Sequence, residues 1–85
     1  MNITVRYFAM LREAVGFDSE TLLVPEDVQT VGALRSWLIS LDEAHARAFA
    51  SVPRIRAAVN LTMASEDSFI AEGDEVAFLP PVTGG

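Results

Sequence analysis

The last six residues of the 85-residue chain, Pro80-Pro81-Val82-Thr83-Gly84-Gly85, are the segment whose residue types point most directly to chemistry. The two prolines cannot donate hydrogen bonds to a sheet, so a preceding strand must end at Leu79. They also favour an extended, stiff backbone, whereas the two glycines carry no side chain. From Leu79 the segment can reach about 20 Å, at roughly 3.3 Å per residue. Such a tail can thread a narrow channel and deliver its terminal carboxylate to a remote active site.

A pair of glycines at a chain end also has a simpler explanation, because frayed termini commonly contain glycine. In this sequence the pair follows two prolines and a patterned apolar segment at residues 76–79. Frayed ends are not usually stiffened at their base. We therefore expect a folded domain over residues 1–79 and a functional tail over residues 80–85.

The composition excludes several chemistries. The chain contains no cysteine, and all six of its basic residues are arginines. Disulfides, Cys-ligated zinc or iron–sulfur sites, thiol nucleophiles and Schiff-base lysines are therefore ruled out. The net charge of -6 disfavours contact with nucleic-acid phosphates and suits a basic partner protein. We expect the single histidine, His45, to be a solvated group on a helix surface rather than a metal ligand.

Hydrophobic residues make up 51% of the chain, which is high for this length. A domain this small leaves part of its apolar surface exposed, and a contiguous patch would mark a partner site. No apolar run approaches the roughly 20 residues of a membrane span. The first residues do not resemble a signal peptide. We therefore expect a cytoplasmic protein that contacts other proteins rather than a membrane.

The first half of the chain shows two kinds of apolar spacing. Apolar residues alternate with polar ones over residues 2–7, and residues 18–24 read as a second strand that pairs antiparallel with the first. Residues 9–15 between them predict a short helical turn that ends at Gly16. Thr30 is a candidate N-cap for the main helix. The apolar stripe of that helix is Val31, Leu34, Trp37, Leu38 and Leu41.

The second half predicts a second short helix and the remaining strands. Ser40 and Glu43 have the spacing of a capping box, which favours a helix over residues 42–50. Residues 56–60 and 76–79 read as strands, the last returning beside the first. The order of elements indicates an α+β roll in which a helix crosses one face of a single sheet.

The residues at the C-terminal end resemble a known family. The string Asp74-Glu75-Val76-Ala77-Phe78-Leu79-Pro80-Pro81-Val82-Thr83-Gly84-Gly85 is similar to the C-terminal signature of the MoaD/ThiS family of ubiquitin-like sulfur carriers, and within it to the small subunits of molybdopterin synthase. The likeness extends to Ala57-Ala58-Val59-Asn60 and to Phe8-Ala9-Met10-Leu11-Arg12-Glu13. It implies a ubiquitin-like β-grasp roll, with a mixed sheet of four to five strands, one main helix and a second short helix.

The resemblance also implies a chemistry centred on Gly85. An ATP-dependent adenylating enzyme of the ubiquitin-activating type would adenylate its carboxylate, and sulfur would displace AMP to leave a thiocarboxylate. A large catalytic subunit, in a heterotetramer of two small and two large subunits, would use that sulfur to convert cyclic pyranopterin monophosphate into molybdopterin. This chain would be a non-catalytic carrier that binds no cofactor. Gly84 would give the backbone the freedom to enter the reactive pose.

A docking surface for such partners is predicted by the strand alternation. Phe8 and Leu79 fall on the outward face of two neighbouring strands. Met63, which follows the strand over residues 56–60, can join them. We predict an exposed apolar patch of Phe8, Met63 and Leu79 at the root of the tail, with Arg12 at its border. Two alternatives stay open: the apolar residues complete the core, and Arg12 is an ordinary surface arginine.

Two other functions remain open at the level of sequence. The first is a related carrier that serves thiamine synthesis or another thiolation pathway. The second is a protein modifier whose terminus is conjugated to lysines. A carrier acquires sulfur in place of one terminal oxygen, whereas a modifier appears in isopeptide linkages.

Overall fold

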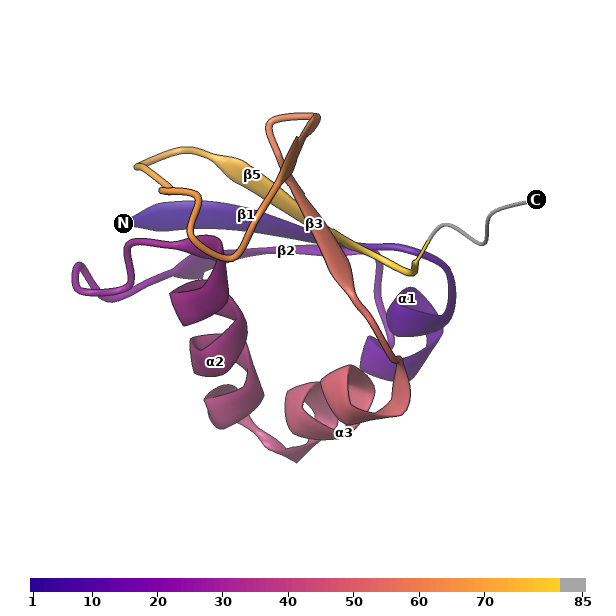
Figure 1. Ribbon diagram of the computed structural model, residues 1–85. Helices are drawn as coiled ribbons and strands as arrows, with labels where there is room; N and C mark the ends of the chain where they lie inside the picture. The colour runs from indigo at the N-terminus through magenta and orange to yellow at the C-terminus, as the bar shows by residue number, and fades with distance from the viewer. Residues whose placement is uncertain (82–85) are drawn as a thin grey trace.

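The computed structural model describes residues 1–81, and it is built around one five-stranded sheet with the order β2-β1-β5-β3-β4 (Figure 1). The strands are β1 (Asn2–Tyr7), β2 (Ser19–Leu23), β3 (Arg56–Val59), β4 (Thr62–Ala64) and β5 (Glu75–Leu79). β1 and β5 are parallel, whereas every other neighbouring pair is antiparallel. The predicted adjacency of the first and last strands is confirmed, and so is the mixed character of the sheet.

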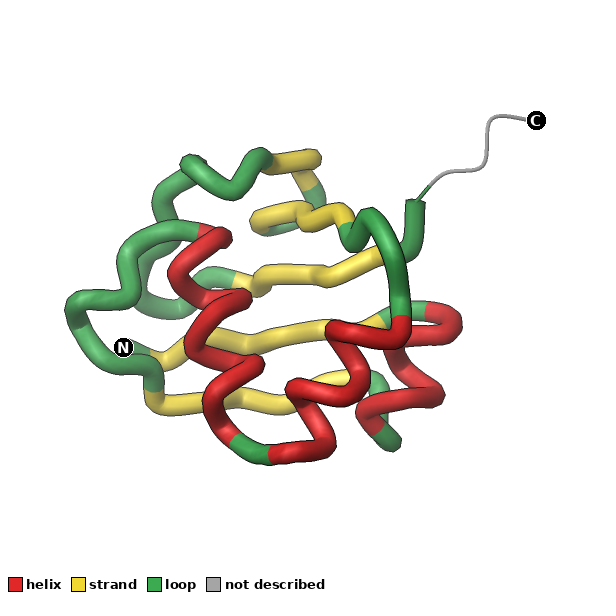
Figure 2. Tube along the Cα trace, turned by 60° about the horizontal axis from the view of Figure 1, so that its bottom comes forward, coloured by secondary structure: helices red, strands yellow, loops and turns green. Residues whose placement is uncertain are grey.

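Three helices cover one face of this sheet (Figures 1 and 2). They are α1 (Ala9–Val15), α2 (Val31–Leu41) and α3 (Glu43–Ser51). The predicted helical turn before Gly16 is α1. Gly16 closes it with φ of 106°, and its N–H donates to the carbonyl of Arg12 at 2.9 Å. This left-handed geometry is one that a residue without a Cβ adopts at no steric cost.

The hydrophobic core lies between the sheet and the helices. Alternation along β1 turns Ile3, Val5 and Tyr7 inward, each at most 1% exposed. From the other layer Leu34 and Leu38 of α2 are fully buried. Burial of each such leucine stabilises the fold by about 1.5–3 kcal/mol relative to exposure. The period-two and period-3.6 patterns of the sequence therefore meet in a single core.

The N-terminal caps of α2 and α3 were both predicted from the sequence, and only the prediction for α2 is confirmed. Thr30 caps α2 as predicted, and its Oγ1 accepts a hydrogen bond from the N–H of Ala33 at 3.1 Å. The expected capping box at Ser40 is wrong, because Asp42 caps α3 by accepting from the N–H of His45 at 2.8 Å. The Ser40 hydroxyl instead donates to a carbonyl within α2. An aspartate directly before the helix satisfies the free N–H groups better than a hydroxyl two residues earlier.

Strand β4 is absent from the sequence prediction. A two-residue turn at Asn60 and Leu61 joins it to β3, with φ of 48° and 70°. Two successive positive φ values are typical of the type I′ turn that best fits the twist of a hairpin. Leucine is an unusual residue at such a position, so the usual Asn-Gly signal for this turn is missing from the sequence.

Strand β5 ends at Leu79, and Pro80 and Pro81 follow it. Both prolines are half-buried against the domain. The rest of the tail, Val82, Thr83, Gly84 and Gly85, lies outside the described residues. Across residues 1–81, none of the helices has the length and apolar character needed to cross a membrane.

Candidate functional site

The face of the sheet that the helices leave uncovered carries the candidate site. In one row across it, Arg6 of β1 is in register with Ala77 of β5, Ala77 with Ala58 of β3, and Ala58 with Met63 of β4. Residues that are paired in register point to the same face of the sheet. The short side chains of Ala77 and Ala58 therefore lie between the longer side chains of Arg6 and Met63. The outward side of the sheet is therefore recessed at its middle strands.

A groove of about 530 Å³ opens at the end of this face, where β5 leaves the sheet. It lies between the start of α1, strands β3, β4 and β5 and the first residues of the tail. Its lining consists of Phe8, Ala9, Arg12, Arg56, Met63, Leu79, Pro80 and Pro81. Leu79 is in register with Arg56, which places an apolar and a cationic side chain next to each other. Most of the lining is apolar, which is typical of sites that bind another protein or a ligand.

The backbone at Phe8 explains how its ring reaches the groove. β1 ends at Tyr7, and Phe8 remains extended, with φ of -125° and ψ of 152°. The chain then turns into α1, and the Phe8 carbonyl accepts from the N–H groups of Leu11 and Arg12 at 3.1 and 3.3 Å. The Arg6 guanidinium lies 5.7 Å from the centre of the Phe8 ring, within the range of a cation–π contact. Phe8 is thereby held half-buried at the mouth of the groove.

The structure therefore brings together the predicted patch residues. Phe8, Met63, Leu79 and Arg12 all line the groove at the root of the tail. Met63 is 53% exposed, whereas Phe8 and Leu79 are half-buried and none of the three is part of the core cluster. That a partner docks there remains a prediction. Arg56 was not predicted, although the inward position of Ala57 implies that its neighbour points outward.

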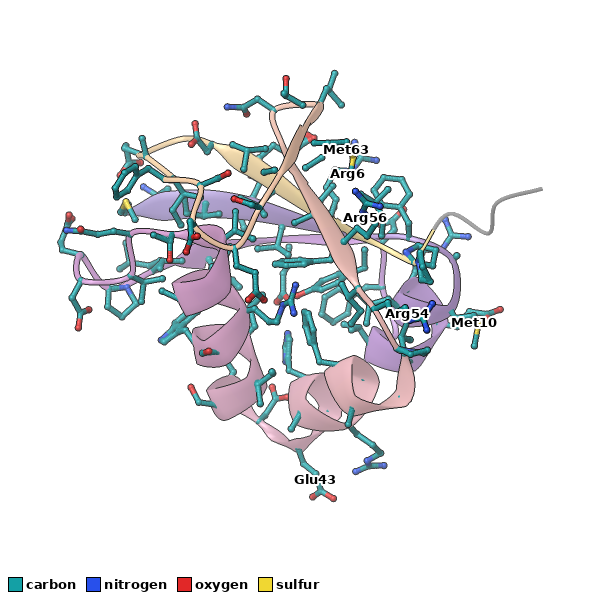
Figure 3. The ribbon with its side chains drawn as sticks, in the orientation of Figure 1. Arg6, Met10, Glu43, Arg54, Arg56 and Met63 are labelled. Atoms are coloured by element: carbon teal, nitrogen blue, oxygen red, sulfur yellow. The ribbon has the colours of Figure 1, made fainter. Side chains whose placement is uncertain are left out.

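Arginines gather on the side of the molecule where β5 ends. Figure 3 shows Arg6, Arg54 and Arg56 on that side together with Met63, whereas Glu43 lies at the far end of the helical layer. Arg6 makes a weak ion pair with Glu75, at 3.7 Å. Within residues 1–81, the ion pairs made by arginines involve Arg6, Arg35 and Arg47, and none involves Arg12, Arg54 or Arg56.

His45 is buried, which corrects the expectation of a solvated group. It is 5% exposed, and its two ring nitrogens contact different carboxylates. Nδ1 lies 2.8 Å from Asp42 Oδ1, and Nε2 lies 2.7 Å from Glu20 Oε2. The Tyr7 hydroxyl donates to the same Glu20 oxygen at 2.7 Å. Helical spacing could not reveal this burial, because the partner carboxylate on β2 is 25 residues away.

The protonation of this cluster follows from its contacts. Burial alone would lower the pKa of His45, but the hydrogen bonds with Glu20 and Asp42 outweigh it and raise the pKa. Burial, followed by the hydrogen bond to Glu20, raises the pKa of the Tyr7 phenol. The two carboxylates contact opposite ring nitrogens, so they fix the orientation of the imidazole ring and do not converge on a common metal position. In the part of the chain that is described, no three histidine or acidic side chains form a metal site.

A mixed β-grasp sheet, with helices on one face and a glycine-terminated tail leaving its central strand, defines the class of ubiquitin-like proteins. Residues 5–85 match the model of the ThiS family, so this chain belongs to the ThiS family.

Curated relatives span nearly its whole length. The molybdopterin synthase sulfur carrier subunit of Escherichia coli is 45% identical over 83 residues, which cover 98% of this chain and 99% of that protein. The subunit of the same name from Haemophilus influenzae is 35% identical, with the same coverage.

A solved structure supports the fold independently. The small archaeal modifier protein 1 of Haloferax volcanii is 28% identical and superposes with a TM-score of 0.78, over 95% of this chain and 98% of that one. The relatives with curated names are sulfur carrier subunits of a molybdopterin synthase.

Proposed function

We propose that this chain is the sulfur carrier of a molybdopterin synthase. In this proposal Gly85 becomes a thiocarboxylate and donates its sulfur to cyclic pyranopterin monophosphate. The principal support is the 45% identity with a sulfur carrier subunit over nearly the whole of both chains. The mostly apolar groove at the root of the tail supports the proposal as well, because such a surface is suited to bind a partner protein.

The activation step converts a poor electrophile into a good one. A terminal carboxylate oxygen attacks the α-phosphorus of ATP and releases pyrophosphate, which leaves an acyl adenylate. A sulfur nucleophile at the oxidation level of hydrosulfide then attacks the acyl carbon and expels AMP. A side chain at the last residue would crowd that carbon, and glycine removes this obstacle. The adenylating enzyme binds the ATP. Because the activation reaction consumes ATP, we place this reaction and the carrier in the cytoplasm.

Sulfur transfer then depends on position. The thiocarboxylate sulfur is a soft nucleophile and is ionised at neutral pH. The tail over residues 80–85 delivers it into the large catalytic subunit, which supplies the acid–base groups and the phosphate contacts. Two small and two large subunits form the proposed assembly. Phe8, Met63, Leu79 and Arg12 hold the carrier on its partner, so that the rate gain comes from proximity and orientation.

Intact-mass spectrometry tests this proposal. The chain is expressed with its adenylating enzyme and a sulfur source, and the expected product has one terminal oxygen replaced by sulfur. Addition of the large subunit and cyclic pyranopterin monophosphate should return the carboxylate form and produce molybdopterin. A chain that never acquires sulfur under these conditions contradicts the proposal.

The structural similarity to an archaeal modifier protein favours a second candidate, a modifier conjugated to lysines. In that case the same mass experiment, performed in a cell lysate, would show Gly85 in isopeptide linkage to other proteins. A carrier for thiamine synthesis would instead lose its sulfur to a thiazole-forming enzyme and not to the large subunit.

A further inference from the structure

We propose that Arg12, Arg54 and Arg56, the arginine rim, bind carboxylates on the large catalytic subunit while the groove beside them takes apolar side chains of the same subunit. This inference rests on the proposed function, and it specifies which chemical groups the large subunit presents to this chain. That surface is acidic and apolar, whereas the net charge of this chain by itself suits a basic partner.

The rim and the groove form one continuous surface. Arg12 and Arg56 both line the groove, although they come from α1 and β3. Arg54 lies two residues before Arg56, and Ile55 between them packs against the core. Arg56, at the start of β3, therefore points away from the core, and Arg54, in the preceding turn with φ of 54°, is exposed. Figure 3 places both at the end of the molecule where β5 ends. A partner segment that fills the groove comes within reach of all three guanidinium groups.

The arginine rim differs from other arginines of the chain in its lack of carboxylate partners within residues 1–81. Arg35 and Arg47 each have a carboxylate within 2.9 Å, Glu66 and Glu43 respectively. The chain has 12 acidic residues for six arginines, yet in residues 1–81 no carboxylate pairs with Arg12, Arg54 or Arg56. Within residues 1–81, three cations thus have no carboxylate partner, although the protein is strongly acidic. Guanidinium groups suit carboxylates at interfaces because they form paired hydrogen bonds and lose little hydration.

The chemistry around the rim favours a protein over a nucleic acid. The groove beside the arginines is lined by Phe8, Met63, Leu79 and two prolines, which fit apolar side chains and offer little to a phosphate backbone. The net charge of -6 repels a polyanion over the rest of the surface. An acidic partner surface feels the same repulsion everywhere except at the rim. The rim therefore selects the orientation in which the tail points toward the partner.

The absence of lysine provides a direct test. Arg56→Lys introduces the only lysine side chain in the 85 residues, and it keeps the positive charge. A carbodiimide joins this amine to a neighbouring carboxylate as an amide, with water transferred to the reagent to give a urea. In the complex with the large subunit, peptide mass spectrometry should find the amine at position 56 joined to an Asp or Glu of that subunit. Arg47→Lys, which lies on α3 beside Glu43, is the matched control and should give no link to the subunit.

Charge reversal gives the energetic counterpart. Arg56→Glu should weaken association with the large subunit by about tenfold at low salt, mainly through a slower association rate. Arg47→Glu changes the net charge by the same amount and should leave the affinity within about twofold, because it lies outside the groove. The difference between the two variants should shrink as sodium chloride is raised.

The outcomes separate this proposal from the function on which it rests. If the wild-type chain acquires sulfur and binds the large subunit, the proposed function stands. Links from position 56 only to carboxylates of this chain, Gly85 included, would then overturn the rim proposal. Tighter binding by Arg56→Glu would overturn it too, as would wild-type binding to a single-stranded DNA oligonucleotide that Arg56→Glu abolishes. If the wild-type chain fails to bind the large subunit at all, the docking part of the proposed function fails with it.

Discussion

The Nε2 atom of His45 on α3 lies 2.7 Å from Oε2 of Glu20 on β2, so a histidine of the helical layer is fastened to an edge strand of the sheet. Its other ring nitrogen contacts Asp42, the residue that caps the same helix. A protonated ring donates to both carboxylates at once. This arrangement ties the position of α3 to the protonation state of one side chain.

The stability of the fold should therefore depend on pH through His45. Its pKa is raised in the folded state, so the folded chain holds the proton more tightly than the unfolded chain does. The stabilisation is complete below the unfolded pKa of about 6.5 and is lost as the pH rises through the folded pKa. Denaturant unfolding at a series of pH values should show the free energy of unfolding falling over that interval.

The variant His45→Gln is the control for this pH dependence. It keeps a side chain that can form hydrogen bonds and removes the titrating group, so the decline with rising pH should disappear. The pKa of Asp42 is lowered, first by the hydrogen bond from the backbone N–H of His45. The contribution of Asp42 to stability is therefore lost as the pH falls through that lowered pKa, well below the interval in which His45 titrates. An unchanged decline in His45→Gln would show that another group causes it.

Tyr7→Phe tests the phenol that shares the Glu20 oxygen. The ring stays in place between Phe17 and Phe49, with centroids 5.9 and 6.4 Å away, so the packing is retained. The hydrogen bond from the buried hydroxyl to the carboxylate is lost. We expect a decrease of about 1–2 kcal/mol in the free energy of unfolding, measured by urea denaturation. A decrease below a few tenths of a kcal/mol would mean that water replaces the phenol without cost.

Met63→Asp tests the groove without disturbing the core. Met63 is 53% exposed, so the free energy of unfolding should change by less than about 0.5 kcal/mol. Binding to the large subunit should weaken by about tenfold or more, because a charge is placed in an apolar contact. Leu61→Asp is the control, since Leu61 is 93% exposed in the adjacent turn and is not among the groove residues. Equal binding losses in both variants would argue against the groove as the docking surface.

Deletion of Gly85 tests the tail. The core residues all lie between Ile3 and Phe78, so the melting temperature should not change. The acyl carbon would then belong to Gly84 and sit one residue short of its position, so sulfur transfer to the precursor should be abolished. The substitution Val82→Ala, which keeps the length of the tail, should retain most of the activity. Normal molybdopterin formation by the truncated chain would contradict the proposed role of Gly85.

Local patterns account for what the sequence predicted well. The alternation of β1 and β5, the apolar stripe of α2 and the Thr30 cap are properties of neighbouring residues, and the structure contains each of them. The stripe is shorter than predicted, because Leu41 is 38% exposed where α2 ends. The Asn60-Leu61 turn was missed since its residues are not those that usually adopt two positive φ values.

The chemical character of the tail, the strand and helix periods and the family resemblance can be read from the amino-acid sequence, because they depend on residue type and short-range spacing. The proximity of Arg56 to Leu79 and the contact of His45 with Glu20 become visible only in the folded chain. Those contacts depend on the strand order and on the way α3 packs against the edge of the sheet. Both are set by the burial of apolar surface over the whole chain, and no local window of residues contains that information.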